Sequence, residues 1–164
     1  MGFTKCVLYA AVIGILSFFL GRVLPKQWFQ PDRFPYRIYA WEQNGNFYNR
    51  VFHIRKWQSR VPDMSKILPG LIPAKKVTLD FEDRLPQMIT ETCIAEGIHW
   101  LLCIFSLPLL WLWPGIGGAL FAILYILLGN LPFILIQRYN RPRFSAIAQR
   151  LARKENGKEE KCLH

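Results

Sequence analysis

Residues 100–137 read WLLCIFSLPLLWLWPGIGGALFAILYILLGNLPFILIQ and carry no charged side chain. As a helix, which rises about 1.5 Å per residue, this stretch is much longer than the roughly 30 Å hydrocarbon core of a bilayer. It therefore predicts two membrane crossings. Proline and clustered glycine break helices, so we expect the chain to reverse direction at PGIGG, residues 114–118.

A second apolar stretch, residues 7–21, predicts a span near the N-terminus. It extends over residues 6–24 if Arg22 reaches the headgroups. A cleaved signal peptide is the alternative, because Lys5 precedes the apolar run, but no small-residue cleavage site follows and we expect a retained anchor. The predicted fold class is all-α: an integral membrane protein with about three transmembrane helices in a single domain, residues 1–164.

Charge and composition place this protein at a membrane. With 52% apolar and 15% aromatic residues and a net charge of +10, the chain is too apolar for an ordinary soluble basic protein. Eleven Lys and Arg residues lie between Lys26 and Arg84 and eight follow Ile136, whereas only Lys5 precedes the first span. By the positive-inside rule, the central segment and the tail are cytoplasmic, and the N-terminus and the 114–118 turn are outside. The predicted location is a bacterial plasma membrane, with the active face cytoplasmic.

Residues 25–90 form a predicted interfacial segment on the cytoplasmic side. Aromatic side chains alternate there with Lys and Arg: Trp28, Phe29, Phe34, Tyr36, Tyr39, Trp41, Phe47, Tyr48, Phe52 and Trp57. This mixture suits headgroup depth and anionic lipid. Single-stranded nucleic acid can bind to a similar mixture, but three adjoining spans favour lipid, and no nucleic-acid partner is expected.

Within this segment, the sequence predicts an amphipathic helix from Phe47 to Arg60. Its apolar residues Phe47, Val51, Ile54 and Trp57 recur near i, i+4, i+7 and i+10, and polar residues occupy the other faces. We expect this helix to lie on the membrane surface.

A loop rich in proline is expected to follow, over residues 62–73. Asp80 or Asp83 then caps a helix that begins near Leu85, with Pro86 in its first turn. This helix leads into the predicted helical hairpin, residues 91–140.

The charged tail comprises residues 144–164, and from Lys154 onward we expect it to be frayed or disordered. The cysteines have neither metal-binding nor disulfide spacing and are interpreted as small apolar residues. They are Cys6, Cys93, Cys103 and Cys162.

The entry to the second span carries a polar wedge. On a helix Glu91, Thr92, Glu96 and His99 fall within about 140° of one another, facing away from the lipid side. Ionisable groups near a membrane are costly and persist most often when paired or functional, although single ones can simply sit in the interface. Glu96 and His99 are one turn apart, so we expect that carboxylate to orient the imidazole. Glu-x-x-His is also half of a di-iron site, but no second half is evident, so no metal is expected.

The third span carries a second polar constellation. Asn130, Gln137 and Arg141 are spaced by seven and four residues and form one stripe, which we expect Pro142 to end. Pro132 frees a backbone carbonyl inside the span, which a neighbouring helix must satisfy. Amides such as these also serve in helix packing. A snorkelling cytoplasmic cuff is the alternative for the arginines of this stretch, Arg138, Arg141 and Arg143.

Three blocks of the sequence together resemble a known family. They are GNFYNRVFHIRKW at residues 45–57 with Asp63, then Glu91-Thr92, Ala95-Glu96 and His99-Trp100, then NLP at residues 130–132 with QRYNRPR at residues 137–143. In these blocks the chain resembles the glycosyl-4,4'-diaponeurosporenoate acyltransferases of staphyloxanthin biosynthesis, which are small membrane enzymes. The resemblance implies transfer of a fatty acyl group to a sugar hydroxyl of a glycosylated carotenoid or related glycolipid. Residues 64–80 match no pattern of the family. If this region adjoins the acceptor cleft, substrate preference would change there, so the acceptor need not be a carotenoid.

Acyl transfer to a sugar needs a base, donors for an oxyanion and a cleft for two apolar tails. We expect His99 to be the base, with Glu96 or Glu91 as its orienting carboxylate. The predicted substrate-binding residues are Asn49, Arg55, Lys56, Trp57, Asn130, Gln137, Arg138, Asn140 and Arg141. The cations among them are expected to hold the phosphorylated carrier of an acyl-CoA or acyl-carrier-protein thioester, with no bound cofactor.

Two other classes of function are compatible with this sequence. A small membrane methyltransferase or reductase also places polar residues at helix ends, but no glycine-rich nucleotide loop is apparent. A non-enzymatic membrane adaptor would explain the spans and the basic aromatic surface, but not the wedge that carries His99. The oligomeric state, the acceptor and the acyl chain are left open by the sequence.

Overall fold

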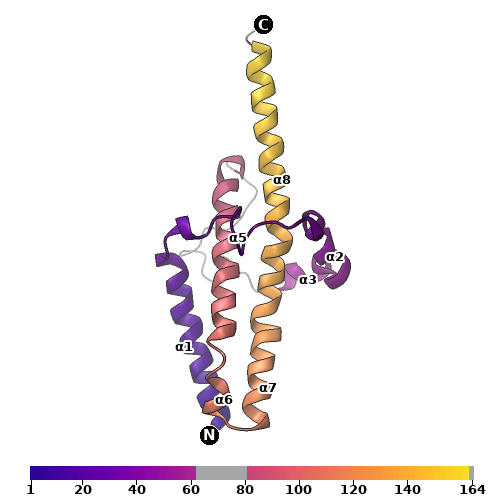
Figure 1. Ribbon diagram of the computed structural model, residues 1–164. Coiled ribbons are helices and arrows are strands. Elements are labelled where there is room, and N and C mark those ends of the chain that lie inside the picture. The colour runs from indigo at the N-terminus through magenta and orange to yellow at the C-terminus, as the bar shows by residue number, and fades with distance from the viewer. Residues whose placement is uncertain (62–80, 163–164) are drawn as a thin grey trace.

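The computed structural model describes residues 1–61 and 81–162 of the chain (Figure 1). The loop predicted over residues 62–73, the cap predicted at Asp80 and the divergent residues 64–80 lie outside these ranges. The regular elements of the described residues are all helical, and three helical runs are long and apolar enough to cross a membrane. They are Gly2–Val23, Glu82–Leu112 and Ile116–Lys154. The predicted all-α class and the three spans are confirmed.

Helix α1 (Gly2–Val23) packs along helix α5 (Phe81–Ile104), with Gly21 next to Ile98. The Tyr9 hydroxyl donates to the carbonyl oxygen of Phe105 at 2.9 Å, where α5 has ended. Pro108 interrupts this span, and the short helix α6 (Leu109–Leu112) completes it. Tyr9 thus satisfies a backbone carbonyl at the break, as an apolar environment requires.

Helix α5 begins earlier than expected. It starts at Phe81, not near Leu85, so Pro86 lies in the second turn of the helix. Asp83 is therefore a residue of the first turn and not the cap, where its negative charge still complements the helix dipole.

The chain reverses between α6 and helix α7 (Ile116–Leu124). Gly115 has a φ of 97°, which glycine adopts without steric cost, and α7 begins at the next residue. The reversal predicted for residues 114–118 is thus shorter, because Gly115 alone provides the left-handed backbone and the later glycines are helical.

The third span contains a π-helical stretch, η4 (Tyr125–Asn130), and continues as helix α8 (Leu131–Cys162). The prediction that Pro142 ends this helix is wrong. Arg138 and Arg141, both just before the proline, fix this part of α8 through side-chain bonds to Glu96 and Thr92, and the helix continues past Pro142. The predicted frayed tail is also wrong: α8 stays helical to Cys162 and extends beyond the other helices, because Ala, Arg, Lys and Glu favour helix there (Figure 1).

The predicted amphipathic helix of residues 47–60 is divided into three pieces. These are α2 (Asn46–Phe52), α3 (Ile54–Trp57) and the 3₁₀ turn η3 (Gln58–Arg60). His53 separates the first two with a left-handed φ of 51°. Tyr48 and Ile54 are buried against Tyr139 of α8, whereas Val51 and Phe52 are exposed, so the position of the segment on the membrane surface stays a prediction.

Two further 3₁₀ turns precede these pieces, η1 (Lys26–Trp28) and η2 (Ala40–Gly45). The segment crosses α5 and α8 at their middle, whereas the N-terminus lies at the end where α6 and α7 join (Figure 1). Consistent with this, the rings of Phe3 and Trp113 are 6.2 Å apart. The N-terminus and the reversal therefore share one end of the molecule, opposite the tail, as predicted. Which end faces the cytosol stays a prediction from charge.

Candidate active site

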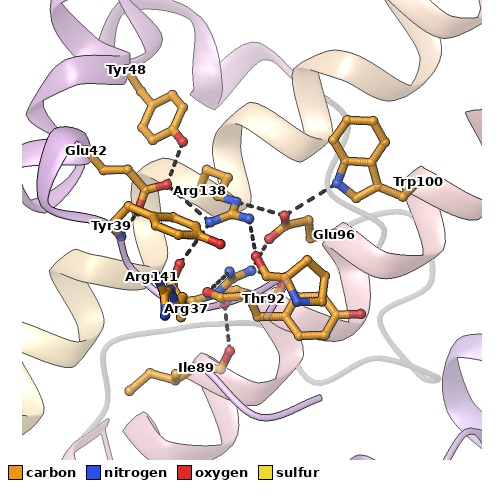
Figure 2. Close-up of polar contacts among 12 residues, drawn as sticks. Arg37, Tyr39, Glu42, Tyr48, Ile89, Thr92, Glu96, Trp100, Arg138 and Arg141 are labelled. Carbon is orange, nitrogen blue, oxygen red and sulfur yellow. Dashed lines mark hydrogen bonds and ion pairs between the residues drawn. The ribbon is translucent and has the colours of Figure 1, made fainter. Parts of the chain in front are cut away.

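A buried cluster of ionised groups joins α5, α8 and the segment before α2 (Figure 2). Two carboxylates, Glu42 and Glu96, and one guanidinium, Arg141, are 1% exposed or less. Arg138 is the second cation, and its side chain is 15% exposed. Two positive and two negative charges thus balance inside the protein, and balance is the condition under which buried charges are tolerated.

Arg141 donates to four acceptors on two parts of the chain. Its Nε donates to Thr92 Oγ1 at 2.9 Å, and its NH2 donates to the Thr92 carbonyl oxygen at 3.0 Å and to Glu96 Oε2 at 2.5 Å. Its NH1 donates to the carbonyl oxygen of Tyr36 at 2.7 Å. This guanidinium fixes α8 to α5 and fixes the segment before η2 to both.

Arg138 makes the matching set of bonds on the other side. Its Nε donates to Glu96 Oε1 at 2.8 Å, and its NH1 donates to Glu42 Oε1 at 3.2 Å and to the Arg37 carbonyl oxygen at 3.1 Å. Its NH2 donates to the carbonyl oxygen of Pro35. Protein acceptors thus engage most of the donors of Arg138 and Arg141, and the role of these two cations in holding a donor phosphate stays a prediction.

Glu42 closes the cluster from η2. Its Oε1 accepts a 2.6 Å bond from the Tyr48 hydroxyl, and its Oε2 accepts the Tyr39 backbone N–H at 2.9 Å. Burial and the hydrogen bond to Glu42 raise the pKa of the Tyr48 phenol well above its usual value. The phenol therefore stays protonated and donates to the carboxylate.

Glu42 was not predicted from the sequence. A signal was present, because Glu42 is the only acidic residue between Asp32 and Asp63, in a segment with many Arg residues. A single acid among many cations is well placed to become the buried partner of one of them.

His99 lies apart from this ionic cluster. Its Nδ1 is 3.0 Å from Asn130 Oδ1, and its ring stacks on Phe133 with centroids 4.6 Å apart and an interplanar angle of 10°. The expected pairing of Glu96 with His99 is wrong: the Glu96 oxygens accept from Arg138, Arg141 and, at 3.4 Å, from Trp100 Nε1. The arginines of α8 attract the carboxylate more strongly than an imidazole does.

The partner of Asn130 determines which nitrogen of His99 carries the proton. The Asn130 amide Nδ2 donates to the Tyr125 carbonyl oxygen at 3.0 Å. Its Oδ1 therefore faces the imidazole and can only accept, so the His99 proton lies on Nδ1. Nε2 is left as the basic nitrogen, with a lone pair for a substrate proton.

The π-helical stretch is what makes this arrangement possible. Asn130 is its last residue, and the amide of Asn130 reaches back five residues to Tyr125. Such stretches are wider than an α-helix and are frequent at functional sites. Pro132, two residues after Asn130, lacks a backbone N–H, which favours the irregular backbone before it.

An apolar groove adjoins His99. Its cavity volume is about 360 Å³, and its walls are Trp57, Arg60, Val61, Leu128, Pro132 and Phe133. Phe133 is shared by the groove and by the stack on His99. The groove thus joins the segment after α2 to the third span, next to the candidate base. Of these residues only Trp57 was predicted as a site residue, because neither a lone Phe in a span nor one Arg among many is distinctive in the sequence.

The remaining predicted residues are dispersed. Glu91 is half-buried and accepts a bond from Gln87 Nε2 at 2.9 Å, away from His99 on the helix. Asn49 Oδ1 accepts the Arg55 backbone N–H at 3.1 Å and so bridges the break at His53. The side chains of Arg55 and Lys56 are exposed, and those of Gln137 and Asn140 are half-buried. Among the described residues, no group of three or more metal-ligating side chains converges.

The fold and the site define a small helical protein of membrane-protein type, with a buried ionic cluster and a histidine held near an apolar groove. Residues 25–150 match the family described as glycosyl-4,4'-diaponeurosporenoate acyltransferase. The chain belongs to this family and is an acyltransferase.

Its curated relatives include the glycosyl-4,4'-diaponeurosporenoate acyltransferases of Staphylococcus aureus strains MRSA252 and Newman. Each is 29% identical over 150 residues, which cover 91% of this chain and 89% of the relative. No solved structure matches the chain. The resemblance noted in the sequence is confirmed, and the matched region contains both the ionic cluster and His99.

Proposed function

We propose that this protein is a membrane O-acyltransferase that transfers a fatty acyl group to a sugar hydroxyl of a glycosylated carotenoid or related glycolipid. Membership of the family supports acyl transfer, and the acceptor is suggested by the names of the relatives. The reaction takes place where the apolar spans meet the polar segment, on the side predicted to be cytoplasmic.

The observation that carries this proposal is the hydrogen bond between His99 and Asn130. Asn130 holds the proton on Nδ1, and Nε2 is thereby prepared to accept a proton from a hydroxyl. Phe133 fixes the plane of the ring by stacking. Asn130 is thus the positioning residue for His99. From the sequence, this role was expected for Glu96 or Glu91.

In the proposed reaction, His99 Nε2 removes the proton as the sugar oxygen attacks the carbonyl carbon of an activated acyl group. The tetrahedral intermediate then collapses, the bond to the leaving group breaks, and the imidazolium returns the proton to that group.

The groove beside His99 provides the apolar surface that an acyl chain needs. Its aromatic and aliphatic walls offer contacts to the methylene groups of such a chain near the candidate base. The exposed Arg55 and Lys56 lie on the same polar segment as Trp57 and remain candidates for contacts with substrate headgroups.

The test is acyl transfer by His99 variants in membranes that contain the acceptor. We expect His99→Ala and His99→Gln to reduce the acylated glycolipid by about 10²-fold or more, as seen for loss of a general base. The product is measured by lipid mass spectrometry, as the mass of one added fatty acyl group. Asn130→Ala should lower kcat by at least about tenfold with little change in KM, because the base stays present but loses its orientation.

His53→Asn is the matched control. His53 is exposed and has a left-handed backbone that Asn tolerates, so this variant should retain full activity. If the His99 variants express normally and acylate as the control does, the proposed mechanism is wrong, and a non-enzymatic role becomes the better explanation.

A further inference from the structure

The groove beside His99 combines one cation with apolar walls. Five of its six lining residues are aromatic or aliphatic, and the sixth is Arg60 of η3, whose side chain is exposed at the rim. Among the described residues no acid pairs with Arg60. A ligand that complements this groove carries a hydrocarbon chain and an anionic group close to it.

The size of the groove limits how far apart these two features of the ligand can be. A cavity of about 360 Å³ is roughly 10 Å across if it is compact, and Arg60 and Phe133 both line it. Because Phe133 also stacks on His99, one aromatic ring separates the groove that holds the guanidinium from the candidate base. A ligand that occupies the groove and reaches past Phe133 to His99 is best served by an anionic group close to its reacting carbonyl.

The two classes of acyl donor differ in this separation. In thioesters of coenzyme A or an acyl carrier protein, the long pantetheine arm separates the phosphate from the acyl carbonyl. In a glycerophospholipid, the phosphate and the ester carbonyls are attached to the same three-carbon glycerol. Only the second geometry places a phosphate at Arg60 while the carbonyl is beside His99 and the chain follows the apolar walls.

The groove is also accessible to a molecule that is already in the bilayer. Leu128, one of its lining residues, is 70% exposed, and its neighbours Leu124 and Leu127 are about half exposed on the outer face of the third span. A donor can enter sideways from lipid, without leaving the membrane.

We infer that the acyl donor is a membrane glycerophospholipid, with its phosphate at Arg60 and its ester carbonyl at His99, in place of the thioester expected from the sequence. This inference rests on the proposed function, since it names the donor for that reaction. The sugar oxygen forms the new ester bond to the carbonyl carbon, and the bond from that carbon to the glycerol oxygen breaks. The proton on His99 passes to the glycerol oxygen, so a lysophospholipid leaves and no further reactant is needed.

The test uses the purified full-length protein in liposomes with glycosyl-4,4'-diaponeurosporenoate as acceptor. In the first arm, phosphatidylglycerol with deuterated acyl chains is the only acyl source. In the second arm, the liposomes consist of ether-linked phospholipid, which has no acyl group to give, and acyl-CoA or acyl-loaded carrier protein is added. Mass spectrometry measures the acylated acceptor and lysophosphatidylglycerol.

We expect deuterated product in the first arm, formed in equal amount with lysophosphatidylglycerol, and less than about a tenth as much product in the second. Product from thioesters alone would overturn this inference but leave the proposed function intact. Absence of product in both arms, with correctly folded protein, would count against both.

Variants of Arg60 give a second readout. Arg60→Gln should raise the KM for phosphatidylglycerol about tenfold with kcat nearly unchanged, because a charge-assisted contact to phosphate is lost, and Arg60→Lys should restore part of it. Arg50→Gln is the control, since Arg50 is exposed on α2 and does not line the groove. Equal KM values for Arg60→Gln and the control would refute a phosphate site at Arg60.

Discussion

The carboxylate of Glu96 is fully buried and is tolerated in its ionised form because two guanidiniums surround it. Arg138 and Arg141 each donate to one of its oxygens, and their other donors reach backbone carbonyls, Glu42 and the Thr92 hydroxyl. Such a cluster contributes little net stability compared with apolar packing, but removing one member leaves an uncompensated buried charge. Each residue of the cluster therefore fixes how the helices and the polar segment are arranged, and its removal lowers the stability of the fold.

Glu96→Gln is expected to lower the free energy of unfolding by about 3 kcal/mol, because the buried Arg141 loses its charged partner. The loss is measured as a fall in Tm in detergent micelles. Glu82→Gln is the control, since Glu82 is exposed on the same helix and should change the stability by less than about 0.5 kcal/mol. Equal Tm values for the two variants would contradict the structural role given to Glu96.

Tyr48 makes stability depend on pH in the alkaline range. Its pKa is raised by burial and by the bond to Glu42, whereas in the unfolded chain it is about 10. A group with a raised folded pKa contributes its full stability below the unfolded pKa, and that contribution is lost as pH rises through the folded pKa. The Tm of the wild type should therefore fall more steeply above about pH 10 than that of Tyr48→Phe. Parallel curves would show that the phenol is not buried as described.

At the scale of the element, the contact between η2 and α8 holds the polar segment in place. Gly45 ends η2 with a φ of 88°, and a Cβ there would lie 2.6 Å from the carbonyl oxygen of Tyr139. Only glycine combines this backbone with so close an approach. The contact places α2, α3 and the wall of the groove over the third span.

Gly45→Ala should destabilise the protein by about 2 kcal/mol, because both the left-handed backbone and the close contact are then strained. We expect faster proteolysis within residues 40–61 as well as a lower Tm. Gly14→Ala is the matched control: no other residue lies within 4 Å of a Cβ at this position of α1, so it should leave the Tm unchanged or slightly higher. If both alanine variants behave alike, the close approach to α8 is not required.

At the scale of the whole molecule, the three long helices separate two ends. One end has the N-terminus and the reversal at Gly115, and the other has the tail of α8 (Figure 1). Lys and Arg are concentrated towards the second end, where Gln149, Arg150 and Arg153 are exposed.

A cysteine-labelling experiment tests this sidedness. In a variant without the native cysteines, Ile116→Cys should react with a membrane-impermeant maleimide in intact cells. Gln149→Cys should react only after the membrane is permeabilised, because the basic end stays cytoplasmic. Labelling of both positions from the same side would contradict a third span between them, and the reverse pattern would place the N-terminus in the cytosol.

The spans could be predicted from the sequence because they depend on long runs of apolar residues, which need no partner to be recognised. The breaks within helices could not. Pro132 and Pro142 are both prolines in the third helical run, yet irregular backbone precedes one and α-helix continues through the other. The two prolines differ in the side-chain contacts that the neighbouring residues make with other helices. Such contacts depend on the tertiary structure and cannot be predicted from local sequence.

The same limit applies to the site. The sequence identified His99, Glu96, Asn130, Arg138 and Arg141 as unusual polar residues in or near spans. It paired them wrongly, because helical spacing relates only residues of one helix. The partner of His99 comes from the third span, 31 residues along the chain, and the partners of Glu96 come from α8. In the structure, both His99 and Glu96 bond to residues of another helix, and not to each other as their spacing of one helical turn suggested.

The position of the two arginines in the chain has a consequence for synthesis and insertion. Glu42 and Glu96 leave the ribosome before Arg138 and Arg141, so the carboxylates lack the partners that they have in the folded protein until the final helix has been made. The aromatic segment can therefore dock only at the end of biogenesis, after all three helices have been inserted. The site therefore assembles only when synthesis of the last helix is complete. A chain that stops before residue 138 lacks both arginines and cannot form the ionic cluster.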